Sequence, residues 1–272
     1  MMLMEPTTSP YDWNFQILGF PVRVAWPFWA LAAVWGYEQC YGLDMVYEQS
    51  GLGSPGVGVL LLLWIGSMFV SILVHELGHA FAFRYFGVDA RVVLYHLGGL
   101  AIPTGSLGFG RIRRRMDQKS EIIVSAAGPA AQLALTLIAT LLAWAAGLQT
   151  DTWIERWLID LGAISEDRLV PTENVAIYAT TYFFISFNFW WALINLVPVL
   201  PLDGGQIARN IIGIFQGNSG WVQATWLSVI VGIGFGLYSL QNEDRFLGMM
   251  FIFLGISNLQ TAQSGNSGGR PW

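Results

Sequence analysis

Two histidines and a glutamate stand at a spacing that suits a metal site, within the pentapeptide His75-Glu76-Leu77-Gly78-His79. On an α-helix, side chains four residues apart lie about 40° apart around the axis, so the two histidines share one face. Both imidazoles can then bind one zinc ion, and Glu76 beside them can accept a proton from a water molecule. In a soluble protein this pattern would indicate a metalloprotease.

The motif directly follows an apolar run, residues 57–74, that contains no charged residue. The two together predict a membrane span with ionisable groups inside it, where such groups are costly and therefore usually functional. Two imidazoles and a carboxylate in hydrocarbon need a partner, and a zinc ion supplies one. We therefore favour metal binding over a structural polar cluster.

A third zinc ligand must come from outside the motif, because catalytic zinc sites usually have three protein ligands. His96 is the one further histidine in the sequence. Asp203 is the other candidate, because the span before it should end on the same membrane face as the motif span. Asp203 also suits a helix N-cap, with Gln206 as its capping-box partner. The spacing alone leaves both roles of Asp203 open.

These motifs together resemble the site-2 protease family of intramembrane zinc metalloproteases. The resemblance rests on the sequence HELGHA at residues 75–80 and on the pattern of Asn195, Pro198 and Leu-Asp-Gly at residues 202–204. It covers roughly residues 57–212, which we take as the catalytic core.

The resemblance implies a role for each matched residue. His75, His79 and Asp203 would bind one Zn²⁺ ion per chain. Glu76 would be the catalytic acid and base, and Asn195 would contact the substrate near the metal.

Two shorter segments are also similar to this family. Residues 97–101 fall where the family has a glycine-containing membrane loop, and residues 127–129 resemble its Gly-Pro pattern in the third core span. The chain departs from the family at Gln132, where an Asn often follows that pattern, and at Leu200, which interrupts a proline-rich stretch. Both departures concern helix packing rather than the metal ligands.

The composition indicates a membrane protein. The chain has 272 residues, of which 54% are hydrophobic and 11% charged, whereas globular domains carry about 25% charged residues. Thirteen tryptophans and seventeen phenylalanines are typical of the aromatic belts at bilayer edges. A net charge of -5 gives no indication of nucleic-acid binding. Cys40 is the single cysteine, so an intrachain disulfide is impossible.

The fold class that we expect is an all-α polytopic membrane protein of about six transmembrane helices. It would have a three-helix catalytic core and room for a short membrane-associated β or loop element, and residues 15–26 would form a short extended or interfacial segment. The six apolar segments of suitable length are residues 27–42, 57–85, 120–147, 175–199, 221–240 and 246–259.

The positions of basic residues predict the orientation of the chain. Six of the thirteen lysines and arginines lie between the second and third spans: Arg91, Arg111, Arg113, Arg114, Arg115 and Lys119. Basic loops stay in the cytoplasm, which places this loop, both termini and the active site on the cytoplasmic side of the cell (inner or plasma) membrane.

We interpret residues 1–272 as one integral membrane domain. The acidic segment 148–174 would be an external loop, and Trp153, Trp157 and Leu161 within it recur at helical spacing, which suits an amphipathic helix on the membrane surface. The tail, residues 261–272, is rich in Gly and Ser and is predicted to be disordered.

The function that we predict is hydrolysis of a peptide bond within or near a transmembrane segment of a membrane-anchored protein, as in regulated intramembrane proteolysis. The partners would be that protein substrate and the lipid bilayer. One alternative is a non-proteolytic zinc-binding or transport protein; a transporter should have polar groups distributed over several spans. Another is a catalytically silent binding partner, which would not need Glu76.

Overall fold

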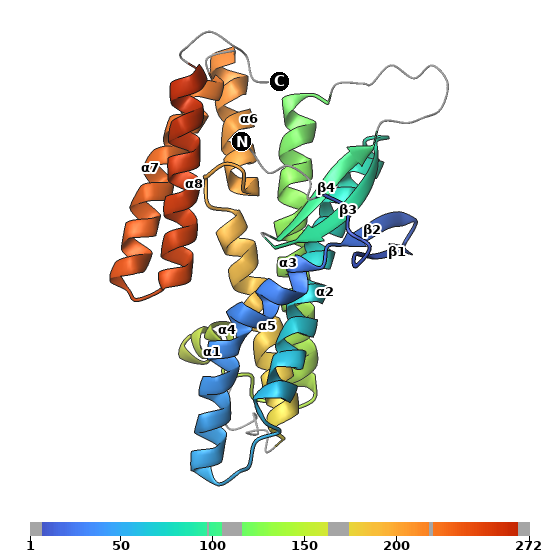
Figure 1. Ribbon diagram of the computed structural model, residues 1–272, viewed down its shortest axis with the longest axis vertical. Coiled ribbons are helices and arrows are strands. Elements are labelled where there is room, and N and C mark those ends of the chain that lie inside the picture. The colour runs from blue at the N-terminus through green and yellow to red at the C-terminus, as the bar shows by residue number, and fades with distance from the viewer. Residues whose placement is uncertain (1–6, 97, 105–115, 163–173, 218–219, 266–272) are drawn as a thin grey trace.

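The computed structural model describes residues 7–96, 98–104, 116–162, 174–217 and 220–265 of the chain. Within these ranges it contains eight helices and one four-stranded sheet (Figure 1). The helices are α1 Pro27–Ser50, α2 Val57–Tyr85, α3 Gln118–Ala145, α4 Trp153–Asp160, α5 Val175–Asn195, α6 Asp203–Gln216, α7 Gly220–Gln241 and α8 Arg245–Gly265.

Five of the described helices are long and apolar enough to cross a bilayer: α2, α3, α5, α7 and α8. The expected polytopic helical fold with a small β element is therefore confirmed. The sixth expected span corresponds to α1, whose 24 residues make a helix about 36 Å long. Glu38 and Asp44 lie within α1 and lower its hydropathy, and α1 is not among these five.

Helices α2, α3 and α5 pack against one another and form the centre of the molecule (Figure 1). Helix α2 has no charged residue before its motif, and its buried residues extend from Leu60 to Ala80, as expected of a central span. The bundle is held on the side of α1 by aromatic rings: Trp35 of α1 contacts Trp64 of α2 and Phe187 of α5. Packing of large rings fixes the relative positions of these three helices.

The sheet consists of β1 Trp13–Ile17, β2 Phe20–Val24, β3 Asp89–Tyr95 and β4 Gly98–Thr104, in that order. Strands β1 and β2 form a hairpin, β2 pairs with β3 in parallel, and β3 pairs with β4 antiparallel. The segment expected to be extended at residues 15–26 is thus largely this hairpin. Both β3 and β4 pack on α2, which places the end strand of the sheet beside the motif helix.

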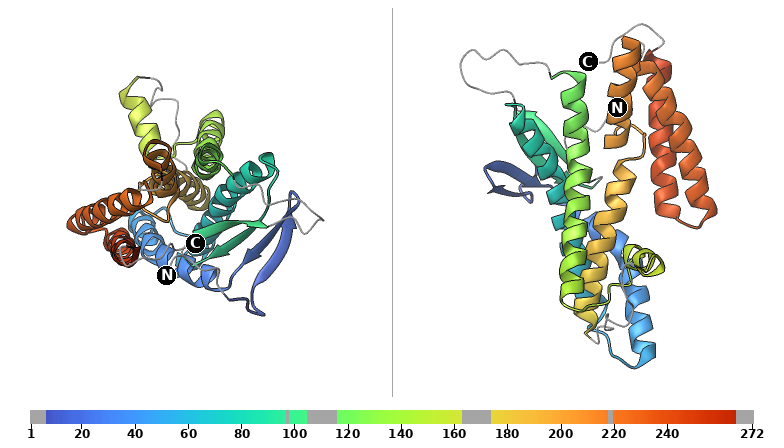
Figure 2. Two further views of the ribbon diagram at one scale, coloured as in Figure 1. Left: turned by 90° about the horizontal axis from the view of Figure 1, so that it is seen from above. Right: turned by 180° about the vertical axis from the view of Figure 1, so that it is seen from behind.

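Helices α7 and α8 form a tight hairpin that packs on α6 through α7. This hairpin and the sheet lie on opposite sides of the central helices, in both the front view and the view from above (Figures 1 and 2). The central helices are therefore supported from two sides by elements of different kinds.

Several expectations concern residues outside the described ranges. Arg111, Arg113, Arg114 and Arg115 of the basic cluster lie there, as do residues 163–173 of the external segment. The described part of that segment does contain a helix, α4, with stacked Trp153 and Trp157 rings. Helix α8 continues to Gly265, so the first five residues of the tail that we expected to be disordered are instead helical.

We predict that Gly78→Ala destabilises the protein, because α2 and α3 are in close backbone contact at Gly78. A Cβ atom there would lie 2.5 Å from the carbonyl oxygen of Ala127. Forcing the helices apart should lower the free energy of unfolding by about 1–3 kcal/mol, measurable as a lower Tm in detergent. Gly66→Ala on the same helix is the matched control, because nothing lies within 4 Å of the added atom. Equal Tm values for the two variants would contradict this account of the α2–α3 contact.

Candidate metal centre

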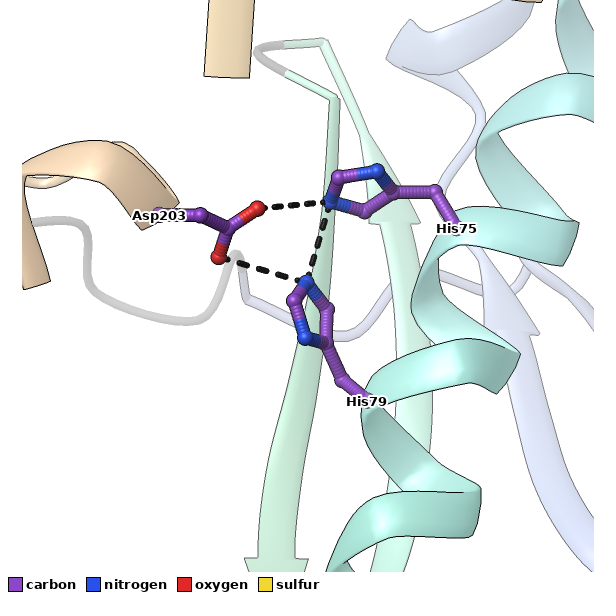
Figure 3. A group of neighbouring side chains, drawn as sticks. All are labelled: His75, His79 and Asp203. Atoms are coloured by element: carbon purple, nitrogen blue, oxygen red, sulfur yellow. Dashed lines mark hydrogen bonds and ion pairs between the residues drawn. The ribbon is translucent and has the colours of Figure 1, made fainter. Parts of the chain in front are cut away.

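Side chains from two helices that are far apart in the sequence meet inside the molecule (Figure 3). His75 Nε2 lies 3.0 Å from His79 Nε2 and 3.0 Å from Asp203 Oδ2. His79 Nε2 lies 3.3 Å from Asp203 Oδ1. In the described part of the chain, these three residues are the group of His, Cys, Asp and Glu side chains that could hold a metal ion.

The local structure at the start of α6 explains why the Asp203 side chain lies beside the two histidines. It is the first residue of α6, and the residue before it, Leu202, is the N-cap without a side-chain capping bond. The capping role that we considered for Asp203 is therefore wrong, and its carboxylate points instead toward the histidines (Figure 3). The expected proximity of Asp203 to the histidine pair is what the structure shows.

Both imidazoles are held in one tautomer by groups outside the motif. His79 Nδ1 lies 2.6 Å from the carbonyl oxygen of Val124, which can only accept, so this nitrogen carries the proton. His75 Nδ1 lies 2.8 Å from Gln132 Oε1. The orientation of the Gln132 amide is fixed because its Nε2 donates to the Ser71 hydroxyl and faces the Ser71 carbonyl. In the neutral form of each imidazole, Nε2 therefore presents a lone pair.

The result is three acceptors that face one another in a buried place. His75 and His79 are 3% and 7% exposed, and Asp203 Oδ2 is buried with no hydrogen-bond donor among the described residues. A single proton can bridge only one of the three contacts, whereas a metal ion satisfies all of them. Nitrogen and oxygen ligands about 2.0–2.1 Å from a tetrahedral zinc ion lie about 3.3 Å apart, close to the observed separations. The donor set and its geometry thus fit zinc.

Helix α3 leaves room for the two rings at Gly128. A Cβ atom at this position would lie 2.3 Å from His79 Nε2 and 2.8 Å from His75 Nε2. Any larger residue would occupy the place where the lone pairs converge. The Gly-Pro pattern at residues 127–129 is thereby linked to the metal site as well as to helix packing.

Glu76 lies on the side of α2 that faces β4. Its side chain is 4% exposed, and a Cβ atom on Gly99 would lie 2.4 Å from its Oε1. The backbone of Ala101, also on β4, lies near the Glu76 carboxylate. The carboxylate is therefore placed between the histidine pair and the end strand of the sheet.

The two remaining candidates lie differently. His96 is exposed at the turn between β3 and β4 and is not part of the group that could hold a metal ion. Asn195, the last residue of α5, is 8% exposed, and its Nδ2 donates one hydrogen bond to the Trp191 carbonyl. Within the described residues the second N–H of that amide makes no further hydrogen bond, so it can donate to a ligand.

Sequence reasoning missed the residues that orient the histidines. Gln132 was recognised only as a departure from the family pattern, and Val124 acts through its backbone, which no residue type reveals. The one usable signal was the presence of an amide inside a long apolar helix, because such groups need hydrogen-bond partners.

Comparison with known sequences adds independent findings. The sequence model of peptidase family M50 matches residues 63–239. The zinc metalloprotease MJ0392 of Methanocaldococcus jannaschii is 22% identical over 196 residues, which are 69% of this chain and 46% of that protein. A Synechocystis protein named as a zinc metalloprotease, sll0528, is 27% identical over 203 residues, or 72% of this chain and 42% of that protein.

A third relative is Rip3 of Mycobacterium tuberculosis, also named as a zinc metalloprotease, with 26% identity over 88% of this chain and 54% of that protein. The chain spans about half the length of the curated relatives that it matches. Among solved structures, a site-2 protease from Methanocaldococcus jannaschii is similar, at 20% identity and a TM-score of 0.49, covering 93% of this chain and 95% of that one.

We predict that Gln132→Leu weakens zinc binding about 10–100-fold, the usual effect of removing a group that orients a ligating histidine. The measurement is competition for zinc with a chromophoric chelator. Thr140→Val is the matched control, since Thr140 is equally buried on α3 but bonds only to the Thr136 carbonyl of its own helix. An unchanged affinity in Gln132→Leu would show that the tautomer of His75 does not depend on this amide.

Proposed function

Because this chain belongs to peptidase family M50, we propose that it is a zinc endopeptidase that cleaves a membrane-anchored protein within or near a transmembrane segment. The observation that carries the proposal is the convergence of His75, His79 and Asp203 beside Glu76, on helices of a membrane protein. A protein that only stored or carried zinc would not need a buried carboxylate next to the ligands.

In this proposal His75, His79 and Asp203 hold the zinc ion. When bound, zinc polarises a carbonyl oxygen and acidifies a water molecule at neutral pH. Glu76 accepts the proton of the attacking water and returns it to the leaving amine. The unused N–H of Asn195 donates to the developing oxyanion, which is the type of contact that stabilises such charge.

The sheet supports a way of holding an extended substrate. A transmembrane helix has its backbone groups fully bonded and must unwind before attack. Strand β4 is the end strand in the order β1-β2-β3-β4, so its second edge pairs with no other strand of the described chain. Pairing of the substrate with this edge would bring its backbone past Gly99 and next to Glu76.

A cavity of about 1560 Å³ supports access from the bilayer. It lies between α1, α5 and the start of α8, and its walls include Trp35, Trp191 and Phe246. Trp191 also lies against β4, since a Cβ atom on Gly98 would be 3.1 Å from its ring. A helical segment in this cavity would therefore be close to the strand that is proposed to receive it.

The arrangement of the first helices supports the proposed orientation. Helix α1 packs on α2 and begins directly after β2, which pairs with the strand that follows α2. If α1 crosses the bilayer together with the five other apolar helices, the chain crosses it six times. Residues 1 and 272 then lie on the side of the bilayer where α2 ends. Arg91 and the other basic residues after α2 indicate that this side is the cytoplasm of a cell membrane.

We predict that Glu76→Gln retains zinc but loses cleavage of a transmembrane reporter by at least about 10²-fold, since the amide cannot accept the proton. Purified wild-type and variant protein are compared for metal content and for cleavage in detergent or liposomes. Cleavage by the variant at the wild-type rate, or cleavage by wild type that resists chelators, would contradict the proposed chemistry.

We predict that His75→Ala, His79→Ala and Asp203→Ala each reduce the zinc content from about one ion per chain toward zero, because each removes one of three ligands. His96→Ala is the control and should keep full metal content. The measurement is elemental analysis of purified protein. Loss of zinc in His96→Ala, together with retention in Asp203→Ala, would exchange the roles of these two residues.

A further inference from the structure

The loop that delivers Asp203 is itself deeply buried. It connects α5 to α6, and Val199 and Leu200 at its centre are completely excluded from the surface. Short backbone hydrogen bonds shape it: Val199 N–H donates to Val197 at 2.7 Å, and Leu202 N–H donates to Val199 at 2.8 Å. The peptide groups of Leu200 take no part in these bonds and need partners elsewhere.

Both partners come from the α7–α8 hairpin. The Leu200 N–H donates to Ser228 Oγ on α7 at 3.0 Å, and Asn258 Nδ2 on α8 donates to the Leu200 carbonyl at 2.6 Å. Ser228 can only accept here, because its own hydroxyl hydrogen is used on the Ala224 carbonyl at 2.8 Å. The second Asn258 N–H is likewise used, on Leu254. Each hydrogen bond to Leu200 is thus fixed in direction.

Leu200 is in direct contact with the first turn of α6. A Cβ atom on Gly205 would lie 2.5 Å from Leu200 N, and one on Gly204 would lie 2.1 Å from the Leu196 carbonyl oxygen. The loop therefore rests on the backbone of the two residues that follow Asp203. The Leu200 peptide is therefore in direct contact with the turn that carries the Asp203 carboxylate.

The hairpin that supplies the two side chains is closely packed. A Cβ atom on Gly232 of α7 would lie 3.1 Å from the Cα of Gly255 on α8, and one on Gly236 would lie 3.0 Å from the Gly248 carbonyl oxygen. Close backbone packing of this kind fixes the positions of Ser228 and Asn258 relative to each other. Their position is set by α7, which packs on α6.

We propose that Ser228 and Asn258 are positioning residues of the metal site. Their hydrogen bonds to the N–H and the carbonyl of Leu200 hold the loop in place and so fix the position of Asp203. This inference rests on the proposed role of Asp203 as a ligand. It gives the α7–α8 hairpin a function beyond anchoring in the membrane. Asn258 lies beyond residues 63–239, the segment that matches the family model.

The test is zinc affinity, measured by chelator competition on the purified full chain for Ser228→Ala and Asn258→Leu. Each should weaken binding about 10-fold or more, as expected for groups that orient a ligand. The visible absorption of the Co²⁺-substituted protein should also change, and kcat should fall while KM is retained. Asn258→Leu keeps nearly the same volume, and Ser228→Thr, which keeps the hydroxyl, should restore affinity.

Matched controls separate positioning from general helix damage. Thr225→Ala and Thr261→Ala remove hydroxyls three residues away on the same helices, which bond only to carbonyls of their own helix. Both should bind zinc within about twofold of wild type and leave the Co²⁺ spectrum unchanged.

Asp203→Ala shows which proposal is at fault. If it abolishes zinc binding while Ser228→Ala and Asn258→Leu bind like the controls, the positioning role is overturned. If Asp203→Ala binds zinc as tightly as wild type, the ligand assignment fails, and the inference fails with it. Equal weakening in the threonine controls would also overturn it, because the effect would then be structural.

Discussion

Three hydrogen-bond acceptors converge in the interior of this protein, and the arrangement of the surrounding helices depends on what satisfies them. Two imidazole lone pairs and a carboxylate within about 3 Å of one another repel unless a cation lies between them. A change of tautomer, which would move the ring proton to Nε2, cannot relieve this repulsion. The hydrogen bonds from His75 to Gln132 and from His79 to Val124 keep that proton on Nδ1. The arrangement of these three groups thus fits a metal ion.

Each neighbouring element contributes one condition for this convergence. Helix α2 places the histidines on one face, and α3 supplies the groups that orient them and a glycine that leaves room for them. The loop before α6 presents the carboxylate, and the α7–α8 hairpin holds that loop through Leu200. Strand β4 places the backbone of Gly99 against the Glu76 carboxylate. A site assembled from so many segments is precise only if all of them pack well.

The sequence predicted the parts of this structure that depend on local pattern. Residues 57–85 were expected as one span and form α2 with the same ends, because an unbroken apolar run has one stable form in a bilayer. The parallel pairing of β2 with β3 was not predictable, since it joins residues about 70 positions apart and leaves no local pattern.

The same distinction holds for the site. His75, Glu76 and His79 stand in a recognisable spacing, and Asp203 was found through its resemblance to a family pattern. The contributions of Val124 and Asn258 could not be found, because one is a backbone carbonyl and the other is an amide 55 positions after the aspartate whose loop it holds. Such contacts form only when whole helices pack together, so no local sequence pattern indicates them.

The most direct measurement is anomalous X-ray scattering at the zinc absorption edge from crystals of the purified protein. The account predicts one strong peak per chain, about 2.0–2.2 Å from His75 Nε2, His79 Nε2 and an oxygen of Asp203. A fully occupied peak bound to other residues, or zinc-loaded crystals in which these three atoms are too far apart to share one ion, would contradict it.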